Sequence, residues 1–271
     1  MKHLKRTVIL IMILATLFSL AACQSESKET ASAKRVGVLM APGAQEKIAH
    51  RKAEHAVEVK YTYYENLTSA LMGLQRGDID VFGSEGAAAE YIVLRHENLM
   101  TGSPSDRLQI DHAMMTMNDK KEVFDILDGA IRDMKADGTM DKLIENDLRA
   151  FIETDAKPKE LPHFEGAETI TVGVTGDVPP MDFVSSSGAP AGFNIALLSE
   201  IANRAQVNFE LVQTESGARP LALSSGKVDA IFWTRNVTCV DCNVTWNEAI
   251  DNTLVTESYI TQPAIDIMLK K

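Results

Sequence analysis

The chain has 271 residues and carries 27 Lys and Arg against 38 Asp and Glu, a formal net charge of −11. An acidic balance of this size disfavours a nucleic-acid-binding protein and a basic membrane-binding face. The length suffices for two small α/β lobes or for one large domain.

The N-terminal residues have the pattern of a secretion signal. A basic start with Lys2 and Lys5 precedes the apolar run 8–20, which is shorter than the about 20 residues that span a bilayer. The run ends in Leu-Ala-Ala-Cys, which resembles the lipobox of bacterial lipoproteins. It predicts a signal peptide over 1–22, lipid attachment at Cys23 and a polar tether over 23–34. An ordinary signal with a chance Cys is the alternative. We expect an extracytoplasmic protein that touches a bacterial membrane through its lipid anchor only.

Two parts of the chain repeat one pattern. The strand-like Arg-Val-Gly-Val-Leu at 35–39 matches Ile-Thr-Val-Gly-Val at 170–174, and the Gly-containing stretch 74–82 matches 223–231. Each part reads as strands that alternate with helices. This alternation predicts an α/β fold of parallel sheets with crossover helices.

Apolar spacing predicts helices over 194–205 and from 119 onward. A capping box of Asp119 and Glu122 is expected to open the second of these helices. Gly138 suits its left-handed C-terminal cap, and Thr139 is expected to cap the following helix.

Four short motifs occur in a characteristic order in the second half of the chain. They are V-G-V at 172–174, P-P-x-x-F at 179–183, G-F-x-x-x-L at 192–197 and G-K-V-D-A-I at 226–231. In this order they resemble the bacterial extracellular solute-binding proteins of family 3, the amino-acid-type receptors of ABC importers. The resemblance implies a hinge-linked, two-lobed periplasmic-binding-protein type 2 fold.

Residues 35–153 resemble the remaining portion of the same family, but in the wrong order. The resemblance therefore implies a circularly permuted chain, and a decayed tandem pair of half-receptors is the alternative. The expected parts are lobe 2 over 35–107, a hinge strand over 108–117, closing helices over 118–153, a linker over 154–167, the lobe 1 core over 168–258 and a second hinge strand over 259–271.

The resemblance also implies a ligand site in the turns after strands, but its usual groups are replaced. Asp241 stands where family members have an Arg for the ligand carboxylate, and Ser84, with Glu85 beside it, replaces an Asp. Either Trp233 stacks on a ligand or it fills the gap of missing aromatics. The expected ligand-binding residues are Ser84, Glu85, Asp177, Asp182, Trp233, Thr234, Arg235, Asn236 and Asp241.

Two of these expectations stay open. Arg235 can replace the lost Arg or be a surface charge. Asp177, Asp182 and Asp241 suit a cationic or amine-bearing ligand, or are solvated carboxylates.

Cys239 and Cys242 form a C-x-x-C that is interpreted as a structural disulfide, with a redox or metal role as the alternative.

These patterns predict a monomeric solute-binding lipoprotein with no cofactor, no metal site and no enzymatic activity. It would capture a small polar, amino-acid-like solute by cleft closure and deliver it to an ABC transporter permease. The alternatives are a sensor domain for a signalling partner, a degenerate receptor, or a dehydratase-type enzyme with Glu85, Asp182 or Asp241 as acid or base.

Overall fold

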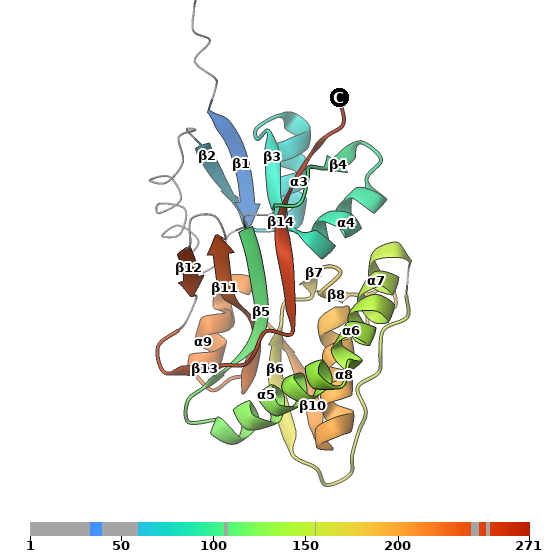
Figure 1. The fold of residues 1–271 in the computed structure, drawn as a ribbon, viewed down its shortest axis with the longest axis vertical. Coiled ribbons are helices and arrows are strands. Elements are labelled where there is room, and N and C mark those ends of the chain that lie inside the picture. Colours follow the sequence, from blue (N-terminus) through green and yellow to red (C-terminus); the bar gives the residue numbers. More distant parts are fainter. Residues whose placement is uncertain (1–32, 40–58, 106–107, 155, 240–243, 248–249) are drawn as a thin grey trace, which may run out of the picture. The chain divides into compact units, whose positions relative to one another are not determined.

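The computed structural model describes residues 33–39, 59–105, 108–154, 156–239, 244–247 and 250–271 (Figure 1). Cys23, Asp241 and Cys242 lie outside the described residues. A π-helical turn, η1 (Ile144–Leu148), joins two of the helices, and a 3₁₀ turn, η2 (Ser216–Ala218), precedes another. The other elements, in chain order, are β1 (Lys34–Leu39), β2 (Val59–Tyr64), α3 (Leu67–Arg76), β3 (Val81–Glu85), α4 (Gly86–Arg95), β4 (Leu99–Thr101), β5 (Leu108–Met117), α5 (Lys121–Ala136), α6 (Thr139–Leu143), α7 (Arg149–Glu153), β6 (Thr169–Val174), β7 (Asp177–Val178), β8 (Asp182–Val184), β9 (Pro190–Ala191), α8 (Phe193–Ala205), β10 (Asn208–Gln213), α9 (Arg219–Ser224), β11 (Ala230–Cys239), β12 (Val244–Asn247), β13 (Thr253–Val255) and β14 (Ile260–Leu269).

The strands form two parallel groups. In the first group β1 pairs in parallel with β2 and β3, and we name this group with α3 and α4 lobe 2. In the second group β6 pairs in parallel with β10 and β11, and we name this group with α5, α8 and α9 lobe 1. The predicted α/β class with parallel sheets is confirmed.

Strand β14 belongs to both groups. Its residues 260–263 pair antiparallel with β5, which itself runs antiparallel to β11 in lobe 1. Its residues 264–267 pair antiparallel with β3 in lobe 2. The continuous strand β14 therefore connects the sheet of lobe 1 to the sheet of lobe 2. Figure 1 shows β14 beside β5 and β3.

The internal repeat has a structural cause in a pair of equivalent Asp residues. The Oδ2 atom of Asp80 accepts a 2.8 Å hydrogen bond from the backbone N–H of Arg35, at the start of β1. In lobe 1, Oδ2 of Asp229 accepts from the N–H of Thr171 at 2.9 Å, in β6. In both lobes the Asp follows a Gly with positive φ and precedes a strand, β3 or β11. Its hydrogen bond connects that strand to the first strand of the lobe, β1 or β6.

The two faces of the lobe 1 sheet are covered by different helices. Along β11 the side chains alternate: Ala230 and Phe232 pack with α5 and α8, whereas Ile231 and Trp233 pack with α9. This is the period of two expected of a strand. Trp233 is only 5% exposed and contacts the cluster of Met115, Ala222 and Leu223.

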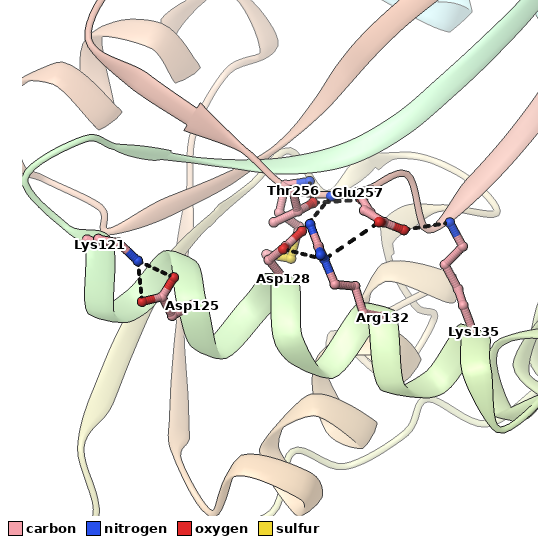
Figure 2. Close-up of polar contacts among 8 residues, drawn as sticks. Lys121, Asp125, Asp128, Arg132, Lys135, Thr256 and Glu257 are labelled. Carbon is pink, nitrogen blue, oxygen red and sulfur yellow. Dashed lines mark hydrogen bonds and ion pairs between the residues drawn. The ribbon is translucent and has the colours of Figure 1, made fainter.

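The helix α5 is held against the segment that leads into β14 (Figure 2). Asp128, buried at 7% exposure, accepts a 2.7 Å hydrogen bond from the N–H of Glu257 and pairs with Arg132 at 2.7 Å. Lys135 pairs with the Glu257 carboxylate at 3.1 Å. The hydroxyl of Thr256 accepts from the N–H of Met114 at 3.0 Å, so the segment is also bonded to β5.

The helix caps differ from the prediction. The N-cap of α5 is Lys120, with no side-chain cap hydrogen bond, so Glu122 lies one position too early for a capping box. Gly138 does take the left-handed conformation, with φ of 77°. Thr139 lies inside α6, where its N–H donates to Oδ1 of Asp137 at 2.9 Å, and Asp137 is therefore the residue that caps.

The start of α8 explains the Pro-Pro and Gly-Phe motifs. The N–H groups of Phe193 and Asn194 have no partner within the helix, and they donate to the carbonyls of Pro180 and Met181 at 3.0 and 2.8 Å. Gly192 directly precedes these two helix residues and has a φ of 110°. A Cβ at Gly192 would lie 2.5 Å from the Met181 carbonyl oxygen. The close approach requires a residue without a side chain.

We predict that Gly192→Ala lowers the free energy of unfolding by about 3 kcal/mol, through backbone strain and the clash with Met181. The matched control is Gly129→Ala in α5, where a Cβ meets nothing within 4 Å. That change should raise the free energy of unfolding by about 0.5–1 kcal/mol, because Ala is the better helix former. Chemical denaturation of both variants measures this, and equal effects would contradict the account.

Candidate functional site

A small polar cavity lies where β3, β5 and the strand ends of lobe 1 meet. Its volume is about 120 Å³, and its lining includes Glu85 from lobe 2, His112 from β5, and Thr175, Arg219 and Thr234 from lobe 1. We name it the inner cavity. Residues that end parallel strands form much of its wall, which is where α/β folds place ligands.

Glu85 and His112 form an ion pair across the inner cavity. Nε2 of His112 lies 2.9 Å from Oε2 of Glu85, out of line for a directed hydrogen bond. Desolvation lowers the pKa of His112, but the charge of Glu85 outweighs it, and the net pKa is raised. Desolvation likewise raises the pKa of Glu85, and the charge of His112 reverses this to a net lowering. Each group therefore favours the charged form of the other.

Arg219 brings a second positive charge to the inner cavity. It begins α9, its guanidinium donates to the carbonyl of Phe232 at 2.7 Å, and it lies 5.6 Å from the centre of the Trp233 ring. Burial lowers its pKa, against the attraction of Asp182 and Asp177. An Arg of ordinary pKa above 12 remains charged after such a shift.

Asp182 is not the solvated carboxylate that the sequence analysis left open as an alternative to a ligand-binding residue. It is 6% exposed, and its oxygens accept from the N–H groups of Thr175 at 2.7 Å and Gly176 at 2.9 Å. Burial raises its pKa, against these two hydrogen bonds. Asp182 therefore fixes the turn after β6 and also gives the cavity wall a negative charge.

Tyr259 lines the inner cavity, and Gln262 contacts Met181, which also lines it. Tyr259, 3% exposed, donates its hydroxyl to Oδ1 of Asn194 at 3.1 Å, and burial raises its pKa, so that it stays a neutral donor. Gln262 of β14 accepts from the N–H of Ala87, in the first turn of α4, at 2.7 Å. The strand that crosses between the lobes thus also anchors the helix that follows Glu85.

A larger hollow adjoins the inner cavity, and Thr175 lines both. Its volume is about 740 Å³, and we name it the outer cleft. Residues around the ends of β2, β6 and β10 form its wall: Glu65, Asn66, Thr175, Asp177, Gln213, Thr214, Glu215 and Gly217.

The predicted site residues separate into three groups. Glu85, Asp182, Trp233 and Thr234 line the inner cavity, and Asp177 lines the outer cleft. Ser84 is not among the described residues that line either one, and Asn236 lines another groove, where its amide lies 3.4 Å from Asp111. The side chains of Arg235 and Cys239, and all of Asp241 and Cys242, lie outside what the structure describes.

Sequence reasoning missed His112, Arg219, Asn194 and Tyr259. Each lies next to apolar residues in the chain, such as His112 before Ala113 and Met114 in β5. A polar residue at such a position has to find a partner when it is buried, and that was the available signal. Among the described residues, no group of three or more His, Cys, Asp or Glu is placed to hold a metal ion. No described helix has the length and apolarity needed to cross a membrane.

Residues 170–239 match the sequence model of the bacterial extracellular solute-binding proteins, family 3. Over this segment the chain is therefore similar to the family 3 solute-binding proteins. The match covers about a quarter of the chain and includes the inner-cavity residues Thr175, Asp182, Arg219 and Trp233. The resemblance inferred from the four motifs is confirmed for this segment. A search among curated proteins found no match.

Solved structures with a similar fold include three that are described by their ligands. The ligand-binding component of an ABC-type import system from Staphylococcus aureus, with zinc bound, has 8% identity and a TM-score of 0.45 over 88% of this chain and 66% of its own. The GluR0 ligand-binding core with L-glutamate has 12% identity and a TM-score of 0.40, over 89% of this chain and 86% of its own. An ABC transporter periplasmic binding protein from Brucella ovis with glutathione bound has 12% identity and a TM-score of 0.48, over 88% of this chain and 63% of its own.

The ion pair predicts a pH-dependent stability. Because the pKa of His112 is raised on folding, its contribution is complete below about pH 6.5 and is lost as the pH rises through the folded-state pKa. Because the pKa of Glu85 is lowered, its contribution is complete above about pH 4.3 and is lost as the pH falls through its folded-state pKa. We predict that His112→Gln lowers the free energy of unfolding by about 2 kcal/mol near pH 6, and by less near pH 9.

Urea denaturation of both proteins across this pH range measures the difference. The exposed His163 provides a control, His163→Gln, for which the difference should stay near zero. A His112→Gln effect that does not change with pH would contradict the ion pair.

Proposed function

We propose that this protein captures a small polar, amino-acid-like solute in the inner cavity and outer cleft. The observation that carries the proposal is that the segment matching the solute-binding family also contributes most of the wall of two adjoining polar cavities. The paired charges of Glu85, His112, Asp182 and Arg219 suit a ligand that carries charge of its own.

The proposal includes cleft closure as the signal. A solute that contacts Glu85 in lobe 2 and Thr234 in lobe 1 together shifts the population toward the arrangement in which both are in reach. The receptor, a monomer held outside the cytoplasm by lipid at Cys23, then presents that arrangement to an ABC transporter permease. Binding, rather than chemistry, is its role.

We further propose that the chain order is a circular permutation of the family order. The packing of α5, α6 and η1 in one core with α8 supports this, because the sequence resemblance assigns these helices to the closing part of such receptors. The passage of β14 from β5 to β3 supports a second connection between the lobes.

A blocking variant tests the proposed function. A Cβ at Gly217 meets nothing within 4 Å, so Gly217→Trp can place a bulky ring in the outer cleft without disturbing the fold. We expect at least one solute from a panel of amino acids, diamines, dipeptides and organic acids to raise the melting temperature of the full-length protein. A ligand at 100 times its Kd stabilises by about 2.7 kcal/mol. Gly217→Trp should remove this shift.

The control is Leu221→Trp, at a position that is 70% exposed on α9 and lines neither cavity. Its ligand-induced shift should equal that of the original protein. A cooperative melt that no member of the panel moves would contradict the proposed function.

A further inference from the structure

Helix α4 of lobe 2 reaches lobe 1 at both of its ends. Glu85, its N-cap residue, lines the inner cavity, and Arg95 is its last residue. The helix has 10 residues, so its two ends lie about 15 Å apart. Strand β14 changes its partner beside Glu85, between Pro263 and Ala264. A rotation of the lobes about this point would therefore move Arg95 much further than Glu85.

Arg95 contacts the end of α7. Its Nη1 atom donates to the carbonyl of Ile152 at 2.8 Å. Its Nη2 atom lies 3.5 Å from the carbonyls of Phe151 and Thr154. The last carbonyls of a helix have no partner within it, and the helix dipole makes this end negative. A guanidinium group from lobe 2 therefore caps α7.

The end of α7 belongs to lobe 1. Ile152 is buried in the same core cluster as Ile131 of α5 and Leu198 of α8. Figure 1 shows α4 and α7 side by side. The contacts of α4 with α7 consequently join one lobe to the other, and they do so apart from the strands β5 and β14.

An ion pair adds to the contact between the two helices. Nη1 of Arg149 in α7 lies 2.5 Å from Oε2 of Glu90 in α4, and both side chains are about half exposed. A single exposed pair of this kind stabilises a structure only slightly. We therefore consider it together with the hydrogen bonds of Arg95.

Aromatic rings connect α4 to the wall of the inner cavity. The ring of Tyr91 in α4 lies 6.2 Å from that of Phe183 in β8, and Phe183 meets Phe151 of α7 edge-on at 5.9 Å. Phe183 directly follows Asp182, which lines the inner cavity. The contacts between α4 and lobe 1 thus extend to the candidate site.

We propose that these contacts hold the two lobes in this arrangement before any solute binds. We name them the clasp, and its residues are Glu90, Tyr91 and Arg95 of lobe 2 with Arg149, Phe151, Ile152 and Phe183 of lobe 1. The clasp exists only while α4 and α7 adjoin, so it stabilises this arrangement relative to one with the lobes apart. It thereby reduces what a solute has to contribute to closure. The inference deepens the proposed function, on which the role of the clasp in solute binding rests.

The distance between the lobes tests the clasp without a solute. A ketone-bearing amino acid at Met100 of β4 and at Lys142 of α6, both exposed, attaches spin labels that leave the native cysteines unmodified. Pulsed electron–electron double resonance on the solute-free, full-length protein then measures the joined population and a separated population of longer distance. We expect the joined population to predominate in the original protein.

Variants of the clasp should change the ratio of the separated to the joined population. Arg95→Met should raise this ratio about tenfold, as expected for hydrogen bonds from a charged group, and Arg149→Gln about threefold, as for an exposed ion pair. The matched control is Lys121→Gln, which breaks a similarly exposed ion pair with Asp125 inside α5 and should leave the ratio unchanged. An unchanged ratio in the variant that combines Arg95→Met with Arg149→Gln would overturn the inference.

A charge swap separates the clasp from a general loss of stability. Glu90→Arg places a second guanidinium beside Arg149, and the repulsion should raise the ratio about threefold or more. Adding Arg149→Glu restores an attractive pair and should bring the ratio back toward that of the original protein. A ratio that stays as high in the swapped protein as in Glu90→Arg would contradict the clasp.

The inference and the proposed function can fail separately. If a solute of the panel stabilises the protein and the clasp variants leave the ratio unchanged, the inference is wrong and the proposed function stands. If the clasp variants separate the lobes and no solute stabilises the protein, the clasp stands and the proposed function is wrong.

Discussion

The structure depends on one strand that pairs in two sheets. Residues 260–263 of β14 pair with β5 in lobe 1, and residues 264–267 pair with β3 in lobe 2. Because the ladder is continuous, the end of β3 with Glu85 is held beside His112 of β5. The inner cavity lies at this junction, and Gln262, at the change of partner, bonds to the first turn of α4. The position of the charged groups thus follows from backbone pairing rather than from any side-chain contact.

The charges of the inner cavity compensate one another at close range. Glu85 pairs with His112, and Asp182 holds a turn while it attracts Arg219. Burial makes isolated charges costly, so this balance stabilises the fold without a ligand. The described wall of the outer cleft carries the carboxylates of Glu65, Asp177 and Glu215.

Much of the fold could be predicted because local patterns determine it. The strand over 108–117 and the helix over 194–205 occur as β5 and as α8, which begins one residue earlier. The caps of α5 and α6 could not be read correctly, because Lys120 pairs with Asp229 and the helix starts later than the pattern indicates. The site was only partly predictable. Thr234 aligns with a polar position of the family, and Glu85 and Trp233 stand out beside positions where the usual residues are replaced. His112 and Arg219, in contrast, meet only after β5 and α9 pack on β11. The alternative in which Trp233 fills a gap agrees with its burial beside Met115 and Leu223.

The most direct measurement is equilibrium dialysis of the purified protein against a small-molecule extract of bacterial cells, followed by mass spectrometry of the retained compounds. The account predicts that one polar solute, or a few related ones, is retained by the original protein and lost in the cleft-blocking variant at Gly217. Retention of the same compounds by both proteins, or of none by either, would contradict the assignment of a solute-binding cleft.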